Sequence, residues 1–305
     1  MSAKAARPFP LVPRRRFLGV QFGRRRTSRR GDGDEIAGTR PYRPGDLTAH
    51  IHWAASARLS EARGTDEFVV RQFFAEQAPR VALVVDRRPG MAIHPSPTPW
   101  MDKRRAAEAA ERLIVASAIA ERGELAFSDG VSRSPIWVRG RGTSLAALDR
   151  RGQGAYRGDT GSLRGALDGV VRDARVLPSG SFVFVVSDFL DPVPTRLWAR
   201  LRALHWDVTP VVVQDPVWES SFPDVGGAAV PLADPATGRV EDVWFSPRGA
   251  RERAAANEAR LARLLDLFRR VGFDPVLVDT ADPAEIAERF HRWAERRRRS
   301  WRTHS

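Results

Sequence analysis

The sequence predicts an α/β fold, a doubly wound and mostly parallel sheet flanked by helices, with a smaller N-terminal β-containing unit. Short apolar runs rich in β-branched residues are typical of strands buried on both faces, and they occur at residues 81–85, 182–186 and 208–213. Segments with apolar residues at helical spacing alternate with them, at about residues 103–121, 195–204 and 247–271. Alternation of strand and helix favours a parallel sheet.

The remaining elements follow from local signals taken in chain order. Residues 51–59 are expected to form a short helix or turn, and residues 67–75, rich in β-branched and aromatic side chains, a strand. Residues 125–127 and 135–138 read as short strands joined by a turn. Gly272 ends the helix that begins at Pro247, and a last strand and helix follow at residues 275–278 and 283–299.

We therefore divide the chain into four parts. Residues 1–30, rich in arginine and proline, are expected to form a basic flexible arm, and residues 31–79 the small N-terminal unit. Residues 80–295 form the main domain, with an insertion at about 214–247 that contains a hairpin turning at Asp234–Gly238. Residues 296–305 are a basic tail.

Composition limits the classes of function. The chain has 305 residues, is 42% apolar and contains no cysteine, so disulfides, zinc–thiolate sites and a cysteine nucleophile are excluded. No apolar run approaches the roughly 18 residues of a transmembrane helix. The segment from Arg14 to Leu18 imitates a twin-arginine export signal, but residues 19–26 are polar and basic where an export signal needs an apolar segment, so a cytoplasmic location is expected.

The positive charge is concentrated at the two ends of the chain. Residues 1–30 carry ten basic and no acidic side chains, and residues 289–305 carry seven arginines and one glutamate. Removing these +10 and +6 contributions from the net charge of +13 leaves −3 for residues 31–288. Basic ends can bind nucleic acid or an anionic surface, although solvated charge on a disordered arm and a frayed terminal helix is the simpler interpretation.

Two aspartates mark a candidate site. Asp86 ends the first apolar run, and Asp188 follows the second, in the segment Ser187–Phe189. Ligands of open α/β sheets bind beyond the carboxyl ends of the strands. Asp86 and Asp188 are therefore expected to share one site at that edge.

A block of residues near the N-terminus carries a resemblance to a known family. Tyr42, Pro44, Gly45 and Asp46, followed by Trp53 and Arg58, are similar to the signature of the domain of unknown function 58 family. Members are bacterial and archaeal proteins built on a von Willebrand factor A-like domain, and they commonly work with MoxR-type AAA+ ATPases. The resemblance covers roughly residues 15–295 and implies the same fold here.

The resemblance also implies a degenerate metal-ion-dependent adhesion site. That site has the pattern Asp-x-Ser-x-Ser, joined by a threonine from a later loop and by a second aspartate. Here Asp86 and Asp188 are kept, Arg88 and Gly90 replace the two serines, and Thr160 or Ser162 stands at the threonine position.

The loss of two hydroxyl ligands leaves too few oxygens for Mg²⁺, so no metal site is predicted. Two readings of Arg88 remain open. Its guanidinium replaces the ion between the two aspartates, or it points to water and the site is vestigial.

The expected function is a non-enzymatic protein-interaction or adaptor module that couples a MoxR-type AAA+ ATPase to a client protein. Its partner-binding face would comprise Asp86, Arg88, Gly90, Thr160, Ser162 and Asp188. No cofactor is expected. The chain has no P-loop, so it is not itself a P-loop ATPase, and it has no Gly-x-Ser-x-Gly nucleophile motif. Nucleic-acid or anionic-surface binding through the basic termini is the alternative, and a metal-dependent hydrolase is a remote third.

Overall fold

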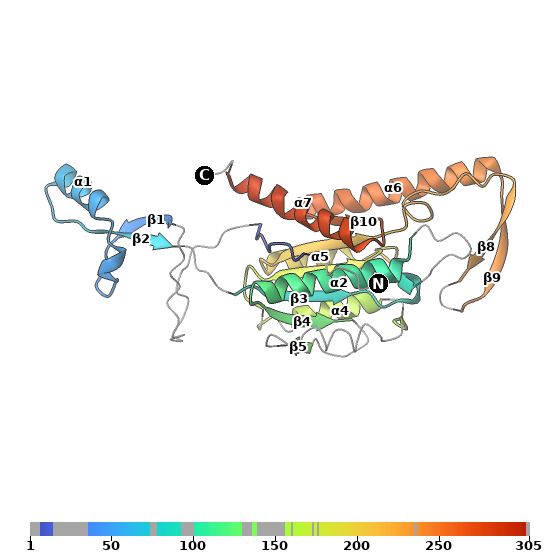
Figure 1. The fold of residues 1–305 in the computed structure, drawn as a ribbon, viewed down its shortest axis with the longest axis horizontal. Helices are drawn as coiled ribbons and strands as arrows, with labels where there is room; N and C mark the ends of the chain where they lie inside the picture. The colour runs from blue at the N-terminus through green and yellow to red at the C-terminus, as the bar shows by residue number, and fades with distance from the viewer. Residues whose placement is uncertain are drawn as a thin grey trace. The chain divides into compact units, whose positions relative to one another are not determined.

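The structure is a computed structural model that describes residues 7–14, 36–73, 78–92, 101–129, 136–138, 156–159, 161–172, 174–175, 177–234 and 237–302. The chain forms two compact units, shown as a ribbon in Figure 1. Unit 1 combines residues 1–13 with residues 79–305, and unit 2 comprises residues 14–78. Unit 2 is thus an insertion near the N-terminus of unit 1.

A six-stranded sheet with the order β10-β7-β6-β3-β4-β5 forms the centre of unit 1. The strands are β3 (Arg80–Val85), β4 (Glu124–Ser128), β5 (Ile136–Val138), β6 (Phe182–Ser187), β7 (Asp207–Val213) and β10 (Val276–Val278). All neighbours pair in parallel except β5, which pairs antiparallel with β4 at the edge. The prediction of a mostly parallel sheet is confirmed.

Helices cover both faces of this sheet (Figure 1). One apolar cluster joins Val81, Leu83 and Val85 of β3 to α2 (Lys103–Ala120) and α7 (Pro283–Arg302). The other joins Ala82 and Val84 to α4 (Ser162–Arg172), α5 (Thr195–Ala203) and α6 (Pro247–Val271). The alternation of side chains along a strand explains why β3 is apolar throughout: each face has its own helical layer.

The N-terminal segment corrects the predicted flexible arm. Phe9 is 1% exposed, and its ring packs against Phe290 and Trp293 of α7 at centroid separations of 4.7 and 5.7 Å. The Phe9 N–H donates to the Ser117 hydroxyl of α2 at 3.0 Å. The prediction of one flexible arm over residues 1–30 is therefore wrong, because the apolar residues Phe9, Leu11 and Val12 belong to the core of unit 1.

The C-terminal basic tail is also corrected. Helix α7 extends to Arg302, and Arg297 within it is buried. The Arg297 guanidinium lies 2.8 Å from a carboxylate oxygen of Asp207 and 3.2 Å from one of Asp274, and over the ring of Trp293. This arginine is part of the folded body, since the carboxylates at the start of β7 and before β10 neutralise it.

The predicted insertion contains a two-stranded antiparallel hairpin between β7 and α6. Across its predicted turn the Asp234 carbonyl accepts the Gly238 N–H at 2.8 Å, and residues 235–236 of that turn lie outside the described residues. Its strands are β8 (Ala228–Ala233) and β9 (Val240–Phe245). Helix α6 follows directly, with the Ser246 hydroxyl accepting the Gly249 N–H at 3.0 Å as an N-cap. Gly272 ends α6 in the left-handed conformation, at φ 86°, as the sequence predicted.

Unit 2 is small and contains β1 (Ile36–Pro41), the 3-10 turn η1 (Thr48–His50), α1 (Trp53–Arg63) and β2 (Val69–Phe73). The two strands pair antiparallel.

Across the part of the chain that the structure describes, no helix combines the length and the apolar character needed to cross a membrane.

Candidate functional site

Asp86 and Asp188 lie together at the carboxyl edge of the sheet. They follow β3 and β6, which pair in parallel so that Val85 faces Val186. The Asp86 N–H continues this ladder by donating to the Val186 carbonyl at 2.9 Å. Both aspartates are almost fully buried.

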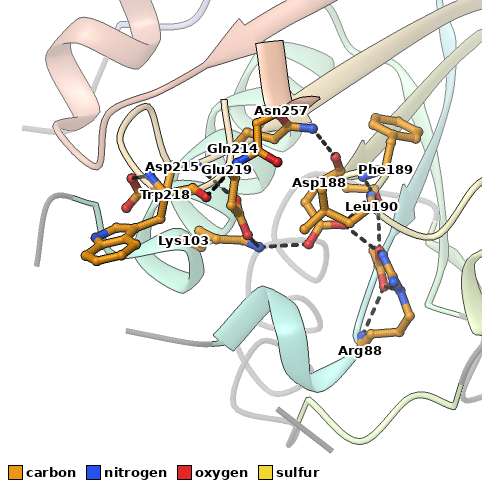
Figure 2. A network of polar contacts seen from close by, with 12 residues as sticks. Arg88, Lys103, Asp188, Phe189, Leu190, Gln214, Asp215, Trp218, Glu219 and Asn257 are labelled. Atoms are coloured by element: carbon orange, nitrogen blue, oxygen red, sulfur yellow. Dashed lines mark hydrogen bonds and ion pairs between the residues drawn. The ribbon is translucent and has the colours of Figure 1, made fainter. Parts of the chain in front are cut away.

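The Arg88 side chain lies between the two aspartates. Its Nε donates to both carboxylate oxygens of Asp86 at 3.0 Å, and its Nη2 also contacts this carboxylate. The same Nη2 donates to Asp188 Oδ1 at 2.8 Å (Figure 2). The side chain is 15% exposed, so the reading in which Arg88 points to water is wrong. The guanidinium bridges the carboxylates of β3 and β6.

A second cation, which the sequence analysis did not identify, holds the other side of Asp188. The Lys103 ammonium, from the first residue of α2, donates to Asp188 Oδ2 at 2.7 Å and to Glu219 Oε1 at 2.6 Å (Figure 2). Its side chain is 4% exposed. Two cations and three carboxylates thus form one connected network, which we call the edge cluster: Asp86, Arg88, Lys103, Asp188 and Glu219.

The electrostatics follow from burial opposed by pairing. Burial alone would raise the pKa of Asp188, but Lys103 and Arg88 outweigh it and hold that pKa below its ordinary value. Burial would likewise lower the pKa of Lys103, yet Asp188 and Glu219 raise it. The pKa of Arg88 is raised for the same reason, by Asp86 and Asp188. Asp188, Lys103 and Arg88 are therefore all charged near neutral pH.

The donor set of the edge cluster does not fit a metal ion. Asp86 already accepts from Arg88 and from the Ser187 hydroxyl, the latter at 2.7 Å, and both oxygens of Asp188 are taken by cations. A divalent ion would have to displace a guanidinium whose own charge repels it. Within the described ranges, no group of three or more histidine, aspartate or glutamate side chains is arranged to hold a metal ion.

The other residues of the predicted face are placed differently. A Cβ added to Gly90 would lie 3.9 Å from Asp188 Oδ2, so this position adjoins the edge cluster with room for a small side chain. Ser162 begins α4, and among the described residues its buried hydroxyl has no hydrogen-bond partner. It makes no hydrogen bond to Asp86 or Asp188. Thr160 lies outside the described residues.

Arg87, the residue before Arg88 in the loop after β3, forms a second buried ion pair. The Arg87 guanidinium lies 2.8 Å from Glu111 of α2 and donates to the Tyr156 hydroxyl at 2.7 Å. The Arg87 carbonyl accepts the Gly158 N–H at 2.8 Å. Burial raises the pKa of Glu111 to about 7, although Arg87 opposes the shift. The two successive arginines after β3 therefore belong to two networks. Arg87 pairs with Glu111 of α2, and Arg88 pairs with the aspartates of the edge cluster.

The signature residues near the N-terminus belong to unit 2, where they shape a turn. Asp46 accepts two hydrogen bonds from Arg40, each 2.7 Å, and one from the Arg43 N–H at 2.8 Å. The Arg40 hydrogen bond is the main cause that lowers the pKa of Asp46 to about 2. Gly45 takes a positive φ of 102°, which suits glycine at this point of the turn.

The aromatic signature residues lie beside this turn. The rings of Tyr42 and Trp53 both meet Phe68 edge-on, at 6.4 and 6.0 Å, and Trp53 is 63% exposed. Pro44 is exposed, and among the described residues the Arg58 side chain donates to the Ala54 carbonyl, one turn back in α1. The signature therefore builds a rigid turn with an exposed indole, in a different unit from the edge cluster.

Comparison with solved structures gives only distant likeness. An aerotolerance-related membrane protein from Bacteroides fragilis is 10% identical, over 72% of this chain and 99% of that one, with a TM-score of 0.39. The pilus adhesin SpaC from Lactobacillus rhamnosus GG is 13% identical, over 72% of this chain and 30% of that one, with a TM-score of 0.37.

Comparison by sequence is more informative. The uncharacterized proteins Rv1480 of Mycobacterium tuberculosis and Mb1516 of Mycobacterium bovis are each 28% identical over 300 residues, covering 97% of this chain and 90% of theirs. The family model described as protein of unknown function DUF58 matches residues 38–263, which include the signature turn, both aspartates and most of α6. The chain belongs to the DUF58 family.

Proposed function

We propose that this protein is a non-enzymatic interaction module with a von Willebrand factor A-like domain, in which side-chain cations replace the metal ion of the adhesion site. One observation carries the proposal: the Arg88 guanidinium bridges Asp86 and Asp188 at the carboxyl edge of adjacent parallel strands. This edge is where open α/β sheets bind their ligands.

The edge cluster favours binding over catalysis. Each carboxylate is held by a cation, so none is free to act as a general base. The cluster instead fixes the loops around it. The Asp188 carboxylate accepts the Leu190 N–H at 3.0 Å, and Asp191 accepts the Gly161 N–H at 3.1 Å, which ties two neighbouring loops together. A rigid loop surface reduces the entropy that a partner must overcome on binding.

The face presented to a partner combines a partly exposed guanidinium with an apolar residue. Arg88 reaches the surface with 15% of its side chain, and Leu190, two residues after Asp188, is 38% exposed. By the resemblance to its family, the partner is a MoxR-type AAA+ ATPase, and the protein acts in the cytoplasm as its adaptor toward a client protein. Such an ATPase would supply the energy of remodelling, while this chain supplies recognition.

Substitution at this face is expected to weaken ATPase binding. Leu190→Arg places a charge on the surface without touching the edge cluster, and Arg88→Glu reverses the charge at its centre. Each is expected to weaken retention of a MoxR-type ATPase from the same genome by at least about tenfold, because buried central contacts dominate an interface. A pull-down with the two purified proteins measures it.

The matched control is Leu47→Arg, which changes an apolar residue of similar exposure, 43%, in unit 2. It should bind as the unaltered protein does. If Leu190→Arg and Arg88→Glu both remain folded by circular dichroism and retain the ATPase normally, the carboxyl edge is not the interface. The turn around Tyr42, Asp46 and Trp53 would then be the next surface to test.

A further inference from the structure

The hairpin β8–β9 presents an apolar face to solvent, and this face has no role in the edge cluster. The ribbon drawing shows the hairpin beside the first part of α6, away from the central sheet of unit 1 (Figure 1). Strand register sorts its side chains into two faces. The inner face includes Val230, which is buried, and Phe245, which packs against Phe222 at 4.8 Å.

The outer face is formed by three cross-strand pairs, and all six residues are exposed: Ala229 with Trp244, Pro231 with Asp242, and Ala233 with Val240. Trp244 is 67% and Val240 60% exposed, the two largest exposures among the bulky apolar side chains in the described part of unit 1. Residues along an antiparallel strand ordinarily alternate between the two faces, so that the solvent-exposed face carries polar side chains. Five apolar residues around one acid are instead typical of a contact surface.

Asp242, the one acidic residue of the outer face, indicates which chemical group this surface can bind. Among the described residues, the Asp242 carboxylate has no ion pair or hydrogen bond, whereas the neighbouring Glu241, on the inner face, pairs with Arg239 at 3.1 Å. Asp242 and Trp244 point to the same side of β9, two residues or about 7 Å apart. An indole face and a free carboxylate at this spacing can together hold one guanidinium or ammonium group, by a cation–π contact and an ion pair.

We propose that the outer face of the β8–β9 hairpin binds a partner protein through an apolar segment that carries one basic side chain, with the base seated between Trp244 and Asp242. The charges of the outer face favour this occupant over others. A second copy meeting face to face would bury Asp242 with no cation opposite, since the outer face contains no base. A membrane surface of anionic lipid would repel it.

The partner is expected to bind the side chains of the outer face and not to pair as an added strand with the edge of the hairpin. Pro231 lacks the N–H that an added strand would need on β8, and Glu241 and Asp242 place charges along β9. Trp244 would bury its large ring at the centre of the contact, as central aromatic residues of interfaces do.

The test uses the full-length protein and a displayed library of random short peptides as the probe. Peptides are selected on the unaltered protein after depletion on Trp244→Ala. The expected consensus is one arginine or lysine flanked by apolar residues. The affinity of a selected peptide, measured by fluorescence anisotropy, should fall at least about tenfold in Trp244→Ala and in Asp242→Lys.

Charge exchange and matched variants complete the design. Replacing the base of the peptide with glutamate should restore binding to Asp242→Lys and abolish it on the unaltered protein. Trp53→Ala and Asp66→Lys, an exposed indole and an exposed acid in unit 2, should leave the affinity unchanged. A consensus without a base, or binding that ignores both hairpin substitutions, overturns the proposal. So does self-association that Trp244→Ala abolishes in sedimentation, because the occupant would then be a second copy.

Discussion

Lys103→Met is expected to lower the free energy of unfolding by about 3–5 kcal/mol, the cost of leaving a buried charge without its partner. The substitution keeps the length of the side chain and removes the ammonium from Asp188 and Glu219. Asp188, 1% exposed, would retain only Arg88 as a cation. Urea unfolding followed by tryptophan fluorescence at neutral pH measures the difference.

Two comparisons separate this effect from general damage to α2. Arg105→Met, on the same helix turn, removes a side chain that is 80% exposed and should change stability by less than about 0.5 kcal/mol. Lys103→Met combined with Asp188→Asn removes both charges and should recover part of the loss. Equal stability of Lys103→Met and the unaltered protein would show that the ammonium is not held by these acids.

Phe9→Ala is expected to destabilise unit 1 by about 3–5 kcal/mol, the usual cost of removing a buried phenylalanine ring. The ring contacts Phe184 of β6 as well as Phe290 and Trp293 of α7, so the lost volume lies where the N-terminal segment meets the sheet and α7. Thermal unfolding monitored by near-ultraviolet circular dichroism is the measurement. Deletion of residues 1–13 should lower the midpoint at least as far.

Arg7→Ala, a substitution at an exposed position two residues away, serves as the control and should be nearly neutral. If Phe9→Ala and the unaltered protein unfold at the same midpoint temperature, the N-terminal segment is not docked in the core, and residues 7–13 form part of a flexible arm.

The sequence predicted the elements of unit 1 well where a periodic signal extends over a whole element. The β-branched runs ending at Val85 and Val186 placed Asp86 and Asp188 at one edge, because strands paired in parallel and in register end together. Helix α6 was predicted with its observed bounds, since Pro247 and Gly272 mark both of its ends.

The N-terminal segment was missed for a physical reason. Phe9, Leu11 and Val12 lie among three prolines, between Arg7 and Arg14, so they show neither helical nor strand periodicity. Their burial depends on contacts with α2 and α7, which come from distant parts of the sequence and meet the segment only in the folded domain. No local pattern encodes those contacts.

The cations and acids that complete the edge were missed because their partners are remote: Lys103 lies 85 residues from Asp188 and 116 from Glu219. A signal was nonetheless present. Lys103 and Glu111 occupy positions of α2 at the spacing of its buried alanines. Lys103 is also one of only two lysines, in a chain that otherwise uses arginine. A compact ammonium between two carboxylates explains that exception.

The most direct test of the account is a calorimetric titration with Mg²⁺ of the unaltered protein and of Arg88→Ser/Gly90→Ser. The double variant removes the guanidinium and adds a hydroxyl where Gly90 has room for one. The unaltered protein should bind no tighter than about 1 mM, and the variant at least about tenfold tighter, because oxygen ligands replace a fixed positive charge. Micromolar binding by the unaltered protein, abolished by Asp86→Ala, would contradict the claim that Arg88 stands in place of the ion.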